Sequence, residues 1–302
     1  EAEAAPLDTA RNTGVVTNEE EASEPNADGE EFTETLTVTG RANPELYVDP
    51  VETLETDPLF LARIDPDDFD IPIVINEDVT RWMSYFTGRG RGYFTRWLER
   101  KGRYESLIVE TMDAEELPRD LMYLSMIESG YMTHAYSRAA AAGLWQFIET
   151  TGTAWGLRVD WWVDERRDPE LATNAAAQFL SHLYERYDDW YLAWAAYNGG
   201  PGRVDRAIRR YETRDFWELV EHNAFPRETD DYVPKLIAAA IIAEYAERYG
   251  FTDIEPEPTL SYDTVTVEPN ISLEVIAECA NTTVEEIREL NPSLRRWALP
   301  PE

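Results

Sequence analysis

Hydrophobic positions recur at helical spacing through most of the chain. Val79, Trp82, Met83 and Phe86 fall at i, i+3, i+4 and i+7, which places them on one stripe of an amphipathic helix. Asp168-Pro169-Glu170 reads as a helix start, with a capping side chain, a proline at the first helical position and an acidic first turn. Further helices are predicted to begin near Phe94, Pro118, Trp190 and Val233. The pattern predicts a mainly α-helical domain over residues 51–255.

The two ends of the chain depart from this pattern. Residues 1–50 are rich in Glu and Thr and poor in large apolar side chains, which predicts an acidic, flexible tail. Pro256 and Pro258 indicate a linker. After it, residues 264–267 (Thr-Val-Thr-Val) predict a short strand, and 273–280 and 284–290 predict two short helices. We expect residues 256–302 to form this linker and a small, truncated β-α-α module.

Composition narrows the range of partners. The 302 residues include 60 Asp and Glu against 27 Lys and Arg, for a net charge of −33. Nucleic acids and anionic lipids need a positive field, so neither is expected as a partner. No apolar run reaches the roughly 20 residues needed to span a bilayer, and a single cysteine excludes an intramolecular disulfide. The chain is expected to be a monomer.

No metal site is predicted from the sequence. The three histidines, His134, His182 and His222, are scattered without the spacing of metal ligands. The acidic run at 65–68 (Asp-Pro-Asp-Asp) lacks a full calcium-loop pattern. It is interpreted as a solvated turn.

One carboxyl group stands out for its surroundings. Glu128 ends the apolar run Met122-Tyr-Leu-Ser-Met-Ile. Apolar neighbours disfavour the charged form, so the pKa of Glu128 should rise. A carboxylic acid that stays protonated near neutral pH can donate a proton to a glycosidic oxygen. The alternative is a structural glutamate at the end of a helix.

Four separated motifs place Glu128 in a wider context. They are Glu128-Ser-Gly-Tyr, followed by Ser137; Ala142-Gly-Leu-Trp-Gln-Phe; Ala196-Tyr-Asn-Gly-Gly-Pro-Gly-Arg-Val; and Glu228-Thr-Asp-Asp-Tyr-Val-Pro-Lys. In this order the chain resembles the soluble-lytic-transglycosylase family, which has the goose-type lysozyme fold, and within it the D type of membrane-bound lytic murein transglycosylase. The resemblance covers roughly residues 70 to 250. It implies a lysozyme-like α-helical catalytic domain.

The resemblance also implies roles for single residues. Glu128 would be the catalytic acid and base, and Tyr197 would hydrogen-bond and position it. Gly143 would let the backbone approach the saccharide. The substrate-binding residues would be Ser137, Gly143, Gln146, Asn198 and Tyr232. Structural alternatives stay open: core aromatics for the two tyrosines, a helix cap for Ser137 and a tight turn for Gly143.

The activity implied by the resemblance is cleavage of peptidoglycan between N-acetylmuramic acid and N-acetylglucosamine, without a cofactor. Glu128 would protonate the β-1,4 oxygen and then deprotonate the muramyl 6-hydroxyl, which gives a 1,6-anhydro end. Two alternatives remain. The chain could be a muramidase that uses Asp160, Asp164 or Asp168 to position water, or an inactive glycan-binding protein.

The last segment carries a second resemblance. The module at about 262–302 resembles a LysM domain, a peptidoglycan-binding fold, and residues 272–292 carry the likeness, although Pro269-Asn270 replaces the family's usual Gly-Asp. Glycan binding by this module and packing against the catalytic domain are both open. A peptidoglycan substrate implies a secreted, periplasmic or cell-envelope location, and whether the native form has an outer-membrane anchor is open. The opening Glu-Ala-Glu-Ala resembles the remnant of a yeast secretion leader.

Overall fold

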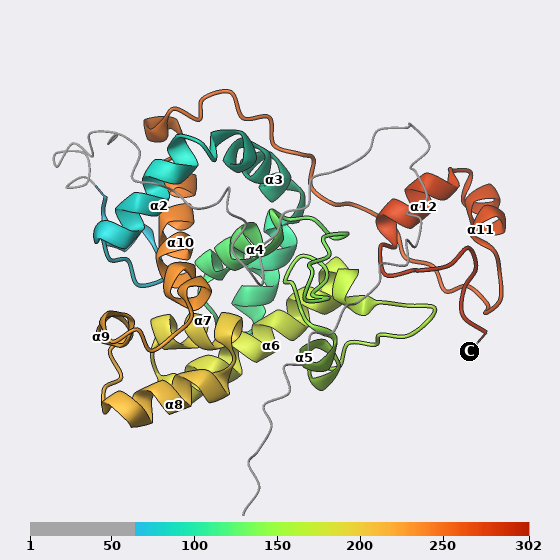
Figure 1. The fold of residues 1–302 in the computed structure, drawn as a ribbon. Helices are drawn as coiled ribbons and strands as arrows, with labels where there is room; N and C mark the ends of the chain where they lie inside the picture. Colours follow the sequence, from blue (N-terminus) through green and yellow to red (C-terminus); the bar gives the residue numbers. More distant parts are fainter. Residues whose placement is uncertain (1–63, 302) are drawn as a thin grey trace, which may run out of the picture. The chain divides into compact units, whose positions relative to one another are not determined.

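The computed structural model of the chain describes residues 64–301. The predicted acidic tail, 1–50, lies outside the described residues. The described part is mainly helical, as the hydrophobic spacing predicted (Figure 1). None of its helices is both long and apolar enough to cross a bilayer.

Several helices begin directly after a residue whose side chain caps them. The Asn76 side chain accepts from the Val79 amide at the start of α2, and Asp189 accepts from Leu192 at the start of α7. Asp168 caps the following helix and Pro169 is its first residue, so this prediction is confirmed. The helices are α2 (Glu77–Thr87), α3 (Arg91–Ala114), α4 (Met122–Ser129), α5 (Glu149–Ala154), α6 (Pro169–Tyr187), α7 (Trp190–Gly199), α8 (Pro201–Tyr211), α9 (Phe216–Glu221), α10 (Arg227–Glu244), α11 (Leu273–Ala280) and α12 (Val284–Leu290).

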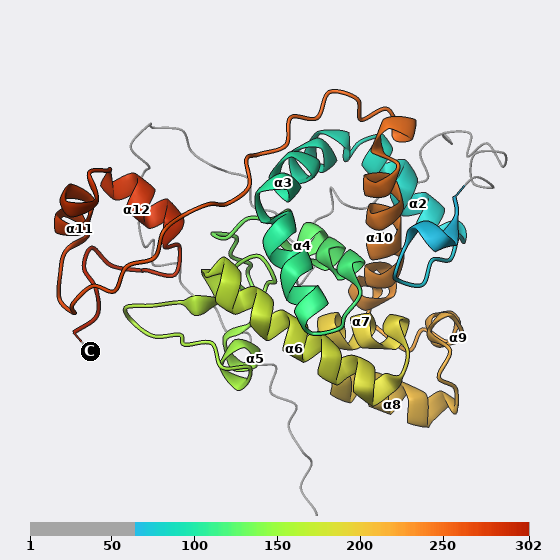
Figure 2. The same cartoon turned by 180° about the vertical axis from the view of Figure 1, so that it is seen from behind.

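Helix α4 lies inside the helical domain. All eight of its residues are buried, including the polar Ser125, Glu128 and Ser129. Helices α3 and α10 both pack against it, and α10 also packs against α2 and α7. Both views show α4 in the middle of these helices (Figures 1 and 2). A helix enclosed on every side is apolar over most of its surface. This explains the apolar run before Glu128 in the sequence.

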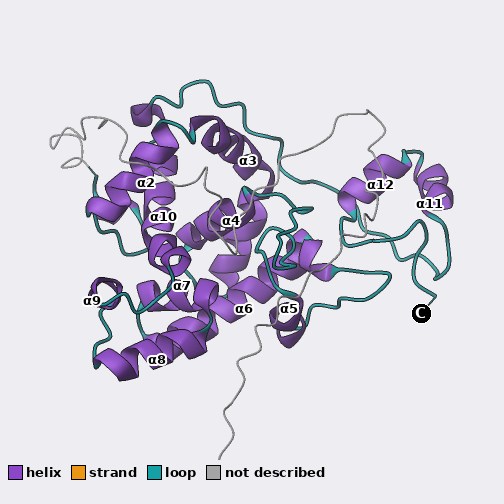
Figure 3. Cartoon of the chain, viewed as in Figure 1, coloured by secondary structure: helices purple, strands orange, loops and turns teal. Residues whose placement is uncertain are grey.

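The predicted strand at 264–267 is wrong. These residues belong to no strand, and the described residues contain only isolated bridges, such as Ser272 with Ala298 (Figure 3). Val265 is 78% exposed, so its side chain has no packed face to join. A β-pattern becomes a strand only when a partner strand or packed surface stabilises it. The two short helices of the module, α11 and α12, are confirmed.

The C-terminal segment is hydrogen-bonded to the helical domain through its backbone. The Asp164 amide donates to the Ser293 carbonyl at 2.8 Å, and the Arg295 amide donates to the Trp162 carbonyl at 2.9 Å. In the linker, the Glu257 amide donates to the Glu99 carbonyl at 2.8 Å. Packing against the helical domain, one of the two alternatives for this module, is therefore present in the structure.

Candidate active site

Glu128 is held at a fixed place by the way α4 ends. Gly130 follows two residues later in the left-handed conformation, with φ at +59°, and its amide donates to the Met126 carbonyl at 2.9 Å. A Cβ at Gly130 would lie 2.2 Å from the indole nitrogen of Trp97. Both the backbone angle and the close contact therefore require glycine. They stop the helix directly after Glu128 and Ser129.

Glu128 is buried, with 5% of the residue exposed. The Tyr232 hydroxyl donates to its Oε1 at 2.7 Å. Burial raises the pKa of Glu128 to about 7, although the Tyr232 hydrogen bond and the charge of Lys235 act in the opposite direction. An acid with this pKa is partly protonated at neutral pH and can act first as proton donor and then as base.

Lys235 is a site residue that the sequence reasoning missed. It lies three positions after Tyr232 on α10, so both side chains project from one face of that helix toward the end of α4. Its Nζ donates to the Ile127 carbonyl at 3.1 Å, directly before Glu128. Burial lowers the pKa of Lys235, while the charge of Glu128 raises it. The signal was present in the sequence, because the fourth motif ends at this lysine.

The structure corrects the hydrogen bond expected of Tyr197. Its hydroxyl donates to the Trp145 carbonyl at 2.8 Å, and Tyr232 makes the hydrogen bond to Glu128 instead. The charge of Glu128 nevertheless acts on Tyr197, since burial and then that charge raise the pKa of Tyr197. Both tyrosines occur in motifs, and only the packing of α7 and α10 decides which hydroxyl reaches the carboxyl.

The second motif forms a loop that is tied to α4, α6 and α7. The Ser129 hydroxyl donates to the Leu144 carbonyl at 2.8 Å, and Ser125 donates to the same oxygen at 3.2 Å. The Trp145 indole donates to the Thr173 hydroxyl on α6 at 2.9 Å. Together with the bond from Tyr197 on α7, these contacts fix the position of the loop. The loop consists of residues 135–147, and we call it the anchored loop.

A buried arginine supports the same loop from another side. Arg166 donates from Nη1 to the Ala140 carbonyl at 2.7 Å and to the Phe147 carbonyl at 3.0 Å. Its other nitrogens form a bidentate pair with Asp164, both at 2.8 Å. Burial acts to raise the pKa of Asp164, but the hydrogen bonds and charge of Arg166 outweigh it and lower that pKa.

The three aspartates considered for a hydrolytic mechanism have structural partners. Asp164 is paired with Arg166. Asp160 accepts from the backbone amides of Trp162 and Val163. Asp168 accepts from the first-turn amides of α6.

The remaining predicted residues lie in or beside the anchored loop. The Ser137 hydroxyl accepts from the Ala141 amide at 3.1 Å, and Gln146 donates to the Gly143 carbonyl at 2.9 Å. Asn198, at the end of α7, accepts from the Thr229 hydroxyl at 2.9 Å. Their sugar-binding roles stay predictions.

Packing requires glycine at position 143, for a reason that the sequence did not reveal. Its φ is +82°, and a Cβ would lie 1.7 Å from the Arg166 carbonyl oxygen. The close approach therefore involves the protein's own backbone, where approach to a saccharide was expected.

Residues 64–301 contain no group of three or more His, Cys, Asp or Glu side chains that could hold a metal ion. The acidic run at 65–68 forms a capped turn, in which Asp65 accepts from the Asp67 amide at 3.0 Å.

Comparison with known families and proteins gives two domain matches. Residues 106–220 match the transglycosylase SLT domain, and residues 261–302 match the LysM-like domain of lytic transglycosylase MltD. The first match contains Glu128 and the anchored loop. It ends before Tyr232 and Lys235.

Two of the similar proteins are transglycosylases by name. The membrane-bound lytic murein transglycosylase D of Escherichia coli K12 is 32% identical over 212 residues, which cover 68% of this chain and 46% of the relative. The chain therefore spans about half the length of that protein. The peptidoglycan transglycosylase gp16 of Escherichia phage T7 is 37% identical over 153 residues, 49% of this chain and 11% of the relative.

Among solved structures, the 70-kDa soluble lytic transglycosylase of Escherichia coli is similar, with a TM-score of 0.43 and 23% identity over 59% of this chain and 31% of that chain. From the two domain matches, residues 106–220 belong to the transglycosylase SLT family, and residues 261–302 belong to the LysM-like family of lytic transglycosylase MltD.

Proposed function

We propose that the chain is a lytic transglycosylase that cleaves the β-1,4 bond between N-acetylmuramic acid and N-acetylglucosamine in peptidoglycan. The observation that carries this proposal is Glu128, a buried carboxyl with a pKa of about 7 inside the matched transglycosylase domain. The printed names of the relatives, a lytic murein transglycosylase and a peptidoglycan transglycosylase, support the substrate.

The two oxygens of Glu128 have different tasks in this mechanism. Tyr232 donates to Oε1, so Oε2 carries the proton toward the glycosidic oxygen. As the bond to N-acetylglucosamine breaks, the substrate's acetamido group stabilises the positive charge that develops at C1. The ionised Glu128 then takes the proton of the muramyl 6-hydroxyl, whose oxygen closes on C1. The product is a 1,6-anhydro end, and no water is consumed.

The sugar subsites are assigned to the polar groups around the anchored loop. Asn198 uses its carbonyl oxygen to accept from Thr229, which leaves its amide nitrogen as a donor to substrate. Gln146 uses its amide nitrogen within the loop, which leaves its carbonyl oxygen as an acceptor. Ser137, Gly143 and Tyr197 shape the same surface, and Tyr232 acts through Glu128.

Hydrolysis of the same bond is the second candidate. It would need a group to activate water, and most glycosidases supply a second carboxylate for this purpose. Asp160, Asp164 and Asp168 hold structural partners, which favours the transglycosylase over the muramidase.

The proposed partner is the glycan strand of peptidoglycan, and the proposed location is the cell envelope. The relative named above is described as membrane-bound, and no helix within 64–301 could span a membrane. The chain is proposed to act as a monomer. The LysM-like module is proposed to add contacts to the glycan.

The test is digestion of purified peptidoglycan by the wild type and by Glu128→Gln, with mass spectrometry of the fragments. Anhydromuramic ends are about 18 Da lighter than hydrolysed ends. We expect only anhydro ends from the wild type and a loss of at least about a thousandfold in the variant. Glu185→Gln, an exposed glutamate on α6, serves as the control and should remain active. Reducing ends would show a muramidase, and no cleavage by the wild type would leave a glycan-binding protein.

A further inference from the structure

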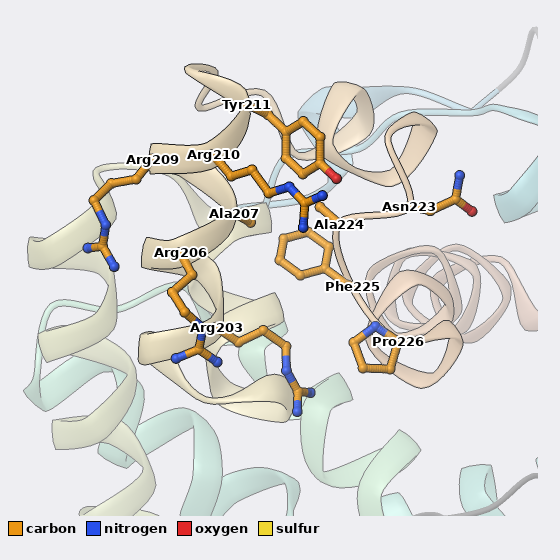
Figure 4. A pocket seen from close by; sticks show the side chains of 10 residues that line it. All are labelled: Arg203, Arg206, Ala207, Arg209, Arg210, Tyr211, Asn223, Ala224, Phe225 and Pro226. Atoms are coloured by element: carbon orange, nitrogen blue, oxygen red, sulfur yellow. The ribbon is translucent and has the colours of Figure 1, made fainter. Parts of the chain in front are cut away.

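A cavity of about 690 Å³ lies beside α8, and all four of its charged lining residues are arginines. Figure 4 shows these arginines spread along the helix, with Arg210 reaching toward Phe225. We call this cavity the arginine groove. Its lining consists of Arg203, Arg206, Ala207, Arg209, Arg210, Tyr211, Asn223, Ala224, Phe225 and Pro226.

Within residues 64–301, the arginines of the groove form no salt bridges, although the chain is strongly acidic. Acidic side chains outnumber basic ones by 60 to 27. Nevertheless, none of the four arginines forms an ion pair with another of the described residues 64–301. Asp205 is the one acid on α8. Its pKa is lowered chiefly by its hydrogen bond with Arg186 of α6, and the charge of Arg209 makes a smaller contribution. Four like charges within eight residues repel one another, so an anionic ligand would stabilise the groove.

The groove begins at the edge of the candidate active site. Helix α8 starts directly after α7, which ends in the Tyr197-Asn198 motif. A Cβ on Gly199 would lie 3.0 Å from the Thr229 hydroxyl and 3.6 Å from Nη1 of Arg203. The Thr229 hydroxyl donates to Asn198. A ligand at Asn198 would therefore have Arg203 within reach.

The opposite wall of the groove is also connected to the site. Pro226 lines the groove and is the N-cap residue of α10, the helix that carries Tyr232 and Lys235. Phe225 is buried and Tyr211 is half-buried, so the groove also presents aromatic surface. A ligand with carboxylates on a partly aliphatic chain would match both kinds of surface.

We propose that the arginine groove binds the carboxylates of the peptide stems carried by the glycan strand. This inference rests on the proposed function, because it takes the strand to lie across Glu128. A guanidinium group pairs with a carboxylate through two parallel hydrogen bonds. The groove would thus select strands that still carry peptides over strands that have lost them.

The test compares Arg206→Gln/Arg210→Gln with Arg89→Gln/Arg100→Gln, a control that removes the same charge elsewhere. Substrates are peptidoglycan with intact stems and the same material after an amidase has removed them. We expect the groove variant to lose about tenfold in kcat/KM on the intact polymer, which corresponds to about 1.4 kcal/mol. On the stripped polymer it should match the wild type. The control should match the wild type on both.

A second measurement keeps this inference separate from the proposed function. Co-sedimentation with both polymers, in a Glu128→Gln background, measures binding without cleavage. The groove variant should sediment less with the intact polymer and equally with the stripped one, and amidation of the stem carboxyls should remove the difference. An equal loss on both polymers, or no loss on either, would overturn the inference. If the wild type cleaves nothing, the proposed function fails, and sedimentation still decides the role of the groove.

Discussion

The acid strength of Glu128 is set by opposing neighbours. Burial among the apolar residues of α4 raises its pKa, while the hydrogen bond from Tyr232 and the charge of Lys235 limit the rise. Without these two groups the carboxyl would hold its proton more tightly, and it would be a weaker acid in the first step of the proposed mechanism. The balance at one residue thus depends on two side chains of another helix.

Replacing Lys235 by methionine should shift the pH profile upward. Removal of the positive charge raises the pKa of Glu128, so the acid form persists to higher pH and the alkaline limb moves up. We expect the ratio of kcat/KM at pH 8 to that at pH 6 to rise roughly threefold. Below the pKa of Glu128 the acid is protonated in both proteins, so the profiles should run parallel there.

The chain offers a matched control for this variant. Its only other lysine is Lys101, which pairs with Glu105 at 2.7 Å on α3. Lys101→Met should leave the pH ratio unchanged. Because Lys235 also donates to the Ile127 carbonyl, its loss should reduce stability as well, and for that reason the pH ratio is the decisive measurement. An alkaline limb that stays in place, or moves down, would show that Lys235 acts only as a structural contact.

At the scale of elements, the sequence predicted structures that depend on neighbouring residues, and it failed for those that depend on distant ones. The helix beginning at Asp168-Pro169 follows from side chains within one turn, so the sequence predicted it. The strand at 264–267 needed a partner elsewhere in the chain, and its residues gave no sign that the partner is lacking. In the site, the apolar run identified Glu128. The bond from Tyr232 depends on how α10 packs against α4, and spacing along the chain does not contain that information.

Two glycines with similar positive φ angles separate the effect of backbone strain from that of crowding. Gly143 has φ at +82° and Gly156 has φ at +86°. A Cβ at Gly143 would lie 1.7 Å from the Arg166 carbonyl oxygen, whereas a Cβ at Gly156 meets nothing within 4 Å. Gly156→Ala should cost about 1 kcal/mol of unfolding free energy, from strain alone. Gly143→Ala should cost about 3 kcal/mol or more, because the backbone must also move.

Denaturant unfolding of both variants measures these costs, and cleavage rates show where the damage lies. Gly143→Ala should lose activity beyond its loss of stability, since Arg166 also holds the loop through Ala140 and Phe147. Similar stability and activity in the two variants would mean that the anchored loop tolerates displacement.

At the scale of the whole molecule, the net charge of the chain opposes the proposed binding to peptidoglycan. A chain with a net charge of −33 is repelled by a polymer that carries carboxylates. The arginine groove offers a local region of opposite sign. Long-range repulsion is screened by salt more strongly than the close contacts in the groove.

Binding to intact peptidoglycan should therefore strengthen with moderate salt. Between about 0.01 M and about 0.15 M ionic strength the Debye length falls from about 30 Å to about 8 Å. The apparent Kd, measured by co-sedimentation, should fall several-fold over this range. Binding to an uncharged chitin oligosaccharide should stay constant. A Kd for peptidoglycan that rises steadily with salt would show that the groove contacts outweigh the net charge.

The anchored loop has a consequence for how such a protein can change over generations. Apart from the bond between the Trp145 indole and Thr173, its anchors are backbone carbonyls: Ser129 contacts Leu144, Tyr197 contacts Trp145, and Arg166 contacts Ala140 and Phe147. Every amino acid carries a carbonyl. The loop can therefore exchange exposed side chains, such as that of Tyr136, and acquire new specificities while the path of its main chain is inherited unaltered.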